Sequence, residues 1–99
     1  MATQLVTIFW RDSPSQVNAQ EGRKRHQIQL GDPFQHAIDR AAMVAGLAGS
    51  DDYLNEWRRE TRPCTDDLEA EALAEVSKIE AEFSREVLAA YATNGGLKP

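Results

Sequence analysis

The pattern of hydrophobic and polar residues changes its period near residue 31. Apolar residues before this point suit strands, whereas those after it recur at helical spacing. Residues 4–11 contain QLVTIFW, a run of β-branched and aromatic residues that predicts a strand. Both faces of this strand are apolar, which is typical of a strand covered on two sides. One face would carry Leu5, Thr7 and Phe9, and the other Val6, Ile8 and Trp10.

Two further strands are predicted at residues 15–20 and 23–30. Pro14 interrupts the apolar run, so residues 11–14 are predicted to turn, and Glu21-Gly22 supplies the positive φ of a tight hairpin. The simplest arrangement is a three-stranded antiparallel meander with the second strand in the middle. The apolar first strand then lies at an edge, so a helix or another subunit must cover it.

Two helices are predicted after the strands, at residues 33–46 and 51–59. Asp32-Pro33 is a typical helix start, and Gly46 can end the first helix in the left-handed conformation. In the second helix, acidic residues occupy the first turn and two arginines the last, as the helix dipole favours. These residues are Asp51, Asp52, Arg58 and Arg59.

A long third helix is predicted at residues 66–92, because apolar residues recur there every three or four positions. Such a helix would be about 40 Å long. A compact chain of this size is roughly 34 Å across. We therefore expect the helix to contribute to a dimer. The predicted fold class is α+β, a single domain over residues 1–99 with a three-stranded antiparallel β-meander followed by three helices.

Composition narrows the classes of partner. The chain has 99 residues and a formal net charge of −5, and all of the excess acid lies in residues 66–99. An acidic surface disfavours nucleic acid and anionic membranes, so we expect neither as a partner. The acidic segment is compatible with a solvated helix face or with a basic protein partner, and both interpretations stay open.

The sequence also bears on the compartment. Cys64 is a lone cysteine, which excludes an internal disulfide and fits a reducing environment. The first residues, MATQ, carry no basic segment, and the apolar run at residues 41–48 is too short to span a bilayer. We therefore predict a cytoplasmic protein with no secretory signal.

The sequence contains no complete catalytic or metal-binding motif, so we predict no catalytic residues, no metal and no cofactor. His26 and His36 have no nucleophile motif beside them, and His36 and Asp39 would supply two metal ligands without a second pair. Cys64 is the candidate reactive thiol. Arg62 and a following helix N-terminus would lower its pKa, whereas Asp66 and the next aspartate would raise it.

Three segments together resemble the small bacterial domain family labelled "virulence factor". They are FWRDSPSQV, GRKRHQIQL and FQHAIDRAAMVAGLAGSDDYLNEWRR, within a resemblance that covers residues 4–96. The family's first block is closer to YWRDIPAQV, so Ser13 and Ser15 make this turn more polar. The resemblance brings no catalytic residue with it. It implies an accessory role beside folate- and corrinoid-dependent one-carbon enzymes.

Two hypotheses about function follow. The first is a non-catalytic protein-interaction module that binds a protein partner or itself, because the first strand is apolar on both faces and no site is evident. The second is a small-molecule-binding accessory protein, or minor subunit, of a folate or corrinoid methyl-transfer system. Aromatic rings with guanidinium groups would suit a planar anionic ligand. The candidate binding residues are Trp10, Arg11, Tyr53, Trp57 and Arg58.

Overall fold

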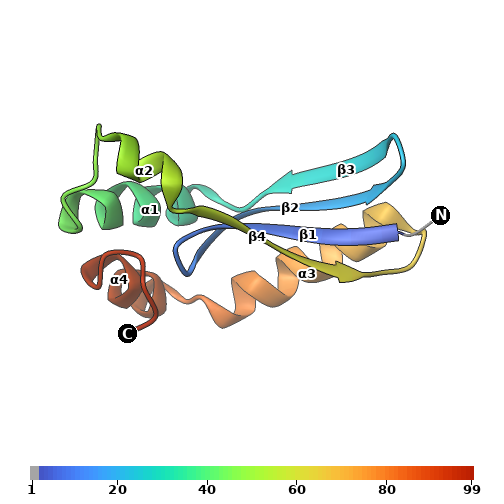
Figure 1. The fold of residues 1–99 in the computed structure, drawn as a ribbon. Helices are drawn as coiled ribbons and strands as arrows, with labels where there is room; N and C mark the ends of the chain where they lie inside the picture. Colours follow the sequence, from blue (N-terminus) through green and yellow to red (C-terminus); the bar gives the residue numbers. More distant parts are fainter. Residues whose placement is uncertain (1–2) are drawn as a thin grey trace.

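The protein is an α+β structure in which four antiparallel strands form one sheet (Figure 1). The computed structural model describes residues 3–99, so Met1 and Ala2, part of the segment predicted not to be a secretory signal, lie outside the described residues. The strands are ordered β3-β2-β1-β4 across the sheet. They span β1 Thr3–Trp10, β2 Ser13–Glu21, β3 Lys24–Gln29 and β4 Trp57–Pro63.

The first three strands confirm the predicted meander, with two local differences. Gly22 adopts the expected positive φ of 59° in the β2–β3 turn. The β1–β2 turn is shorter than predicted, because β2 already begins at Ser13. Arg11 carries the positive φ of this turn, 56°. A shift of register between Ile8 and Phe9 leaves Ser15 without a partner in β1, as in a β-bulge.

The expected arrangement of the sheet is wrong at its edge, because residues 51–59 do not form one helix. The helix α2 spans Asp51–Asn55 only, and the chain then extends as β4 and pairs with β1. The strand β1 is therefore interior, and β4 covers the edge for which a helix or a second subunit was expected. Arg58 and Arg59, which suggested the last turn of a helix, lie instead on opposite faces of β4, where both are exposed.

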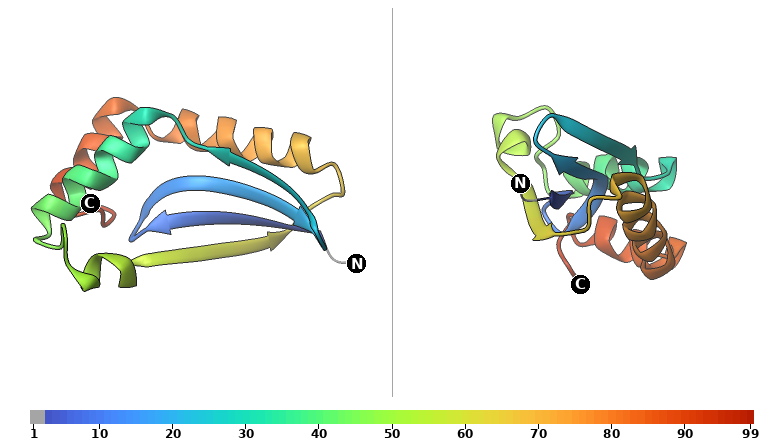
Figure 2. Two further views of the ribbon diagram at one scale, coloured as in Figure 1. Left: turned by 90° about the horizontal axis from the view of Figure 1, so that it is seen from above. Right: turned by 90° about the vertical axis from the view of Figure 1, so that its right-hand side faces the viewer.

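The helices cover one face and one end of the sheet (Figure 2). Helix α3, Leu68–Glu82, lies across the β2–β3 half of one face. Helices α1, Asp32–Val44, and α4, Arg85–Thr93, pack against each other at one end of the sheet. Gly46 ends the α1 segment with φ 73°, as predicted.

The prediction of one helix over residues 66–92 is wrong, because the chain breaks at Phe83 and Ser84. Ser84 starts α4 as its N-cap, and its hydroxyl accepts a hydrogen bond from the Val87 amide (3.3 Å). Phe83 packs between Phe34 (6.0 Å between ring centroids) and Tyr91 (5.0 Å). The break turns α4 onto α1, so the length argument for a dimer no longer applies.

Two buried hydrophobic clusters result. The main cluster fills the space between the sheet, α3 and the α1–α4 pair. The corner cluster lies where the end of β1 meets α1. The main cluster consists of Leu5, Val17, Ala19, Leu30, Phe34, Ala37, Ala72, Val76, Ile79, Leu88 and Ala92. The corner cluster consists of Trp10, Ile38, Ala41 and Ala42, with Ala45, Leu47, Tyr53 and Trp57 packed against them.

In the described part of the chain, each helix is too short or too polar to cross a membrane.

Candidate functional site

Trp10 is the centre of the corner cluster and is fully buried. Its indole Nε1 donates a hydrogen bond to the carbonyl oxygen of Tyr53 (2.9 Å). The Tyr53 ring packs against the indole with a centroid distance of 5.4 Å and a tilt of 30°. The polar edge of Trp10 is therefore satisfied inside the protein, and one ring face is covered by α2.

Arg11 bends the chain with a positive φ, and its side chain also contacts Trp10. Its guanidinium carbon lies 5.3 Å from the Trp10 ring centroid, within the range of a cation–π contact. One terminal nitrogen donates to the Gly95 carbonyl oxygen (3.1 Å), and the other lies 3.5 Å from the Glu56 carboxylate. The Nε atom is buried without a hydrogen-bond partner. Arg11 thus joins the C-terminal turn to the residue preceding β4.

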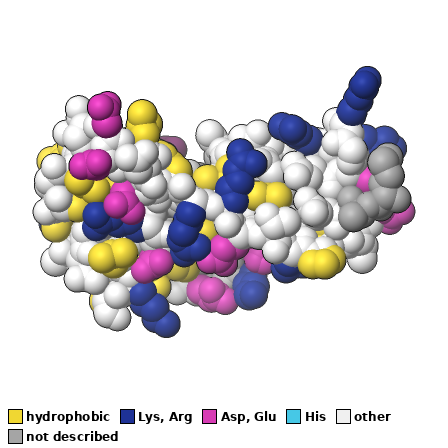
Figure 3. All heavy atoms as spheres, viewed as in Figure 1, with side chains coloured by type: hydrophobic (Ala, Val, Ile, Leu, Met, Phe, Trp, Pro, Cys, Tyr) yellow, Lys and Arg dark blue, Asp and Glu magenta, His cyan; other side chains and the backbone are white. Residues whose placement is uncertain are grey.

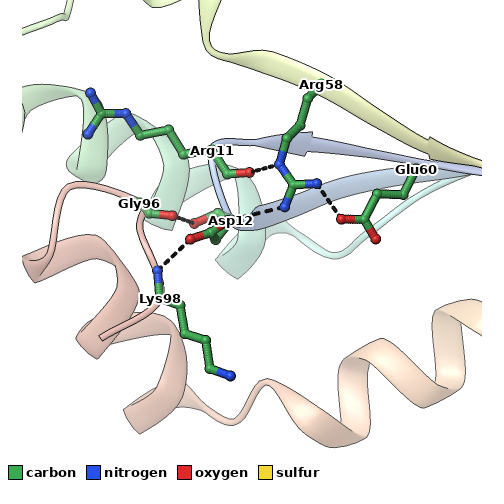
Figure 4. Close-up of polar contacts among 7 residues, drawn as sticks. Arg11, Asp12, Arg58, Glu60, Gly96 and Lys98 are labelled. Atoms are coloured by element: carbon green, nitrogen blue, oxygen red, sulfur yellow. Dashed lines mark hydrogen bonds and ion pairs between the residues drawn. The ribbon is translucent and has the colours of Figure 1, made fainter.

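Asp12 and Arg58 extend this junction at the surface (Figure 4). Arg58 donates to the Arg11 carbonyl oxygen (2.6 Å) and the Asp12 carboxylate (3.1 Å), and it pairs with Glu60. The hydrogen bond to Glu60 raises the pKa of Arg58, which keeps its charge. The second Asp12 oxygen accepts from the Lys98 amide (2.8 Å). Asp12 therefore holds both β4 and the C-terminal residues.

The C-terminal turn docks directly on Trp10. The Gly96 carbonyl oxygen accepts from the Asp12 amide (2.9 Å) and from the Ser13 hydroxyl (3.3 Å). A Cβ at Gly96 would lie 2.8 Å from the Trp10 ring, so only glycine fits this approach. Ser13 is buried, and its hydroxyl serves this internal bond. The block FWRDS therefore closes a corner of the fold.

The five candidate binding residues do come together at this corner. Trp10 and Trp57 are paired in the β1–β4 register, and Tyr53 packs edge-on against Trp57 at 6.0 Å. Burial raises the pKa of the Tyr53 phenol, and the Asp39 charge adds to this effect. Arg58 lies over the Phe9 ring at 4.5 Å. The rings and guanidinium groups thus cover one another, and a planar ligand would need a free ring face that the buried Trp10 does not offer.

Exposed apolar side chains lie at the end of the molecule where α1 leads into α2, and Figure 3 shows hydrophobic side chains interspersed with acidic ones at this end. Met43 is 68% exposed, Val44 53% and Leu54 66%. Met43 and Tyr53 border a shallow hollow of about 260 Å³. We call Met43, Val44 and Leu54 the helical end. All three side chains lie outside the two buried clusters.

A larger groove of about 340 Å³ runs between β4, β1 and α3. Leu5, Thr7 and Ile79 contribute to its lining, together with charged side chains of β4 and α3. This groove could not be predicted while residues 57–59 were assigned to a helix. Trp57 and the β-branched Thr61, residue types enriched in strands, stand on the same side of the alternation, and charged residues occupy positions 58, 60 and 62. This pattern is the signal that favours a strand here.

Cys64 follows β4 and is partly buried. Burial raises the pKa of its thiol, the Glu71 carboxylate raises it further, and Arg62 has a smaller opposing effect. The predicted helix N-terminus lies further on, because Asp67 caps α3 by accepting from the Ala70 amide (3.2 Å). The thiol is therefore the stable form at neutral pH.

Within residues 3–99, His, Cys, Asp and Glu side chains do not gather in threes as a metal site would require. Glu75 is the buried acid of the groove, and its carboxylate lies 3.4 Å from the Arg62 guanidinium. This ion pair links β4 to α3, and its structural role accounts for the buried carboxylate.

Comparisons with known proteins agree with the sequence resemblance. The profile of a family described as "Virulence factor" matches residues 8–91, which include the corner cluster, the helical end and most of α4. Searches of curated proteins and of solved structures gave no match. The chain belongs to the virulence factor family.

Proposed function

We propose that this protein is a non-catalytic, cytoplasmic interaction module whose helical end binds another protein. The observation that carries the proposal is the exposure of Met43, Val44 and Leu54 on two adjoining helices. Exposed apolar side chains beside a hollow are typical of protein-interaction surfaces, and Met43 borders such a hollow. The hollow beside Met43 would accept one apolar side chain of a partner.

The surroundings of the helical end support the same proposal. The corner cluster holds α1 and α2 in place, since Trp10 bonds to Tyr53 and packs with Ala41 and Ala42. A docking surface on rigid helices loses little conformational entropy on binding. Asp39 borders the hollow, and Asp51 and Asp52 lie in the first turn of α2, the helix that carries Leu54. A partner with an apolar anchor and basic flanks would suit this surface.

Substitution of the helical end tests the proposal. We expect the double variant Met43→Glu and Leu54→Glu to fold, because both side chains are exposed. Affinity capture from the protein's own cells should recover specific proteins with the unmodified chain. The double variant should recover these proteins at least about tenfold less, because charges would replace two binding anchors.

Leu73→Glu is the matched control. Leu73 is also an exposed apolar residue (49%), but it lies on α3, away from the helical end. We expect this variant to capture the same proteins as the unmodified chain. Equal capture by all three proteins would contradict the proposal, as would loss of capture with Leu73→Glu alone.

A further inference from the structure

The strand β4 is an open edge of the sheet. It pairs with β1 on one side, and no other strand of residues 3–99 lies along its second side. Its residues from Arg58 to Pro63 are exposed. An open edge presents unpaired backbone groups that can hydrogen-bond to another strand. This edge is a surface separate from the helical end, and the inference holds whether or not the helical end binds a partner.

The hydrogen bonds at both ends of β4 show which backbone groups face outward. The Arg11 amide donates to the Glu56 carbonyl (3.0 Å), and the Cys64 amide donates to the Thr3 carbonyl (3.1 Å). Hydrogen-bonded positions alternate along an antiparallel pair, so the even-numbered residues of β4 bond to β1. The amide and carbonyl groups of Trp57, Arg59 and Thr61 therefore point to the open edge.

The side chains along the same strand alternate in charge. Glu56, Arg58, Glu60 and Arg62 follow one another at every second position, and Arg62 reaches Glu75 on the α3 side of the sheet. Figure 3 shows basic and acidic side chains interspersed across the middle of the molecule, where β4 passes. Charges on an edge often prevent pairing. This order of charges is self-complementary when the strand meets a copy of itself running antiparallel.

We propose that two copies of this protein associate through β4, which would extend the two sheets into one. In the register that places Arg59 opposite Arg59 of the second copy, the outward backbone groups bond to each other. Arg58 then faces Glu60 of the second copy, and Glu56 faces Arg62. These are non-hydrogen-bonded pairs, in which opposing side chains lie closest.

The alternative registers are less favourable. A shift of two residues keeps the backbone pattern but places Glu60 opposite Glu60 and Arg58 opposite Arg62, so like charges meet. In the favoured register, the two Arg59 side chains oppose each other on the far face of the sheet, where both are exposed to solvent. Registers centred on Trp57 or Thr61 bring together only one kind of Glu–Arg pair each, so the register centred on Arg59 joins the most opposite charges. It is a two-fold arrangement, which is the symmetry of most homodimers.

Sedimentation equilibrium of the unmodified protein should show a monomer–dimer equilibrium. One strand pair is a small interface, so we expect a dissociation constant between about 1 μM and 1 mM. Thr61→Pro removes an amide that faces the open edge and leaves the bonds to β1 intact. We expect this variant to be monomeric throughout that range. A monomeric unmodified protein would overturn the proposal.

A charge exchange tests the register itself. Glu60→Lys places a lysine opposite Arg58 of the second copy, and Arg58→Glu places a glutamate opposite Glu60 of the second copy. Each variant alone should dimerise at least about tenfold more weakly than the unmodified protein. An equimolar mixture should form a heterodimer with restored affinity, because each altered residue then meets an opposite charge. Lys24→Glu, a change at an exposed position of β3 on the other edge of the sheet, is the control and should leave the equilibrium unchanged.

Two other results would also overturn the proposal. A dimer that withstands Thr61→Pro and both charge variants forms elsewhere and overturns the proposal. A dimer lost in the double variant of Met43 and Leu54, but not in the β4 variants, would also overturn it and assign self-association to the helical end. Circular dichroism of Arg58→Glu should confirm its fold, because Arg58 also bonds to Arg11 and Asp12.

Discussion

The main cluster and the corner cluster are both buried, but they are built differently. The main cluster joins regular apolar stripes of the sheet, α3, α1 and α4. The corner cluster depends on one large residue, Trp10, and on polar contacts that bring the C-terminal turn across the end of β1. We therefore expect the main cluster to tolerate truncation of one of its side chains better than the corner cluster tolerates truncation of Trp10.

This difference assigns a structural role to the block FWRDS, at the end of β1 and the start of β2. A tryptophan and an Arg-Asp pair at a chain reversal suggest a binding site. Their partners are instead Tyr53, Gly96 and Arg58 of the same chain. The block thus fixes α1, α2 and the start of β4. The proposed interaction surfaces, the helical end and the β4 edge, both adjoin the corner that the block closes.

The largest expected effect is that of removing the central residue of the corner cluster. Trp10→Ala should lower the free energy of unfolding by about 3–5 kcal/mol, because it leaves a cavity and an unpaired Tyr53 carbonyl. Urea denaturation followed by circular dichroism measures this loss. Hydrogen exchange at the Lys98 amide should also accelerate, since the turn that presents it to Asp12 loses its support.

Leu5→Ala is the matched change in the main cluster, because Leu5 is equally buried in the same strand. It should cost about 2–5 kcal/mol of stability. The Lys98 amide should keep its protection relative to the global free energy of unfolding. If both variants release the C-terminal turn alike, the two clusters are one cooperative unit and the distinction fails.

A smaller effect is expected from the polar part of the corner. Asp12→Ala removes the acceptor of the Lys98 amide and of Arg58, and should destabilise the fold by about 1 kcal/mol. Asp39→Ala, on the surface of α1, removes only the bond from Gln35 four residues away and should cost about 0.2–0.5 kcal/mol. Thermal or urea unfolding compares them, and equal losses would show that Asp12 is an ordinary surface residue.

The smallest effect on the fold concerns Cys64, at the opposite end of β4 from the corner. Its thiol pKa is raised, so the fraction of thiolate at neutral pH is below that of a free cysteine. Alkylation by iodoacetamide should therefore be slower than for a cysteine peptide. Glu71→Gln should lower the thiol pKa and speed the reaction, because the carboxylate favours the protonated form.

The raised pKa of Cys64 also makes the free energy of unfolding depend on pH. A thiol whose pKa is raised on folding stabilises the folded state at pH values below the unfolded pKa, and this contribution is lost as the pH rises through the folded value. Cys64→Ser should flatten the alkaline side of the stability profile. A thiol that titrates at or below the ordinary value would contradict the burial of Cys64.

The fold can be predicted from the sequence where structure depends on near neighbours in the chain. The β-branched and aromatic run in residues 4–10, the turn at Gly22 and the Asp32-Pro33 start predict β1, β3 and α1 well. These features need contacts within a few residues, and their periodicity is visible without knowledge of the fold.

The errors lie where distant segments decide the local structure. Residues 57–63 form a strand because β1 offers an edge, although their charges also suit a helix end. Phe83 ends α3 because Phe34 and Tyr91 receive its ring, although the apolar stripe continues past it. Gly96 docks on Trp10 from the far end of the chain, and its sequence context alone indicates only a helix terminator.

The most direct test of the closed corner compares two glycines. Gly96 and Gly49 both have positive φ, 88° and 77°, but only Gly96 faces the Trp10 ring, whereas a Cβ at Gly49 would meet open space. Each change to alanine should cost about 1–2 kcal/mol of backbone strain. Gly96→Ala should cost about 1–3 kcal/mol more, because its methyl group displaces Trp10. Urea denaturation measures the difference in the free energy of unfolding. A clearly larger loss for Gly96→Ala supports the account, and equal losses would contradict it.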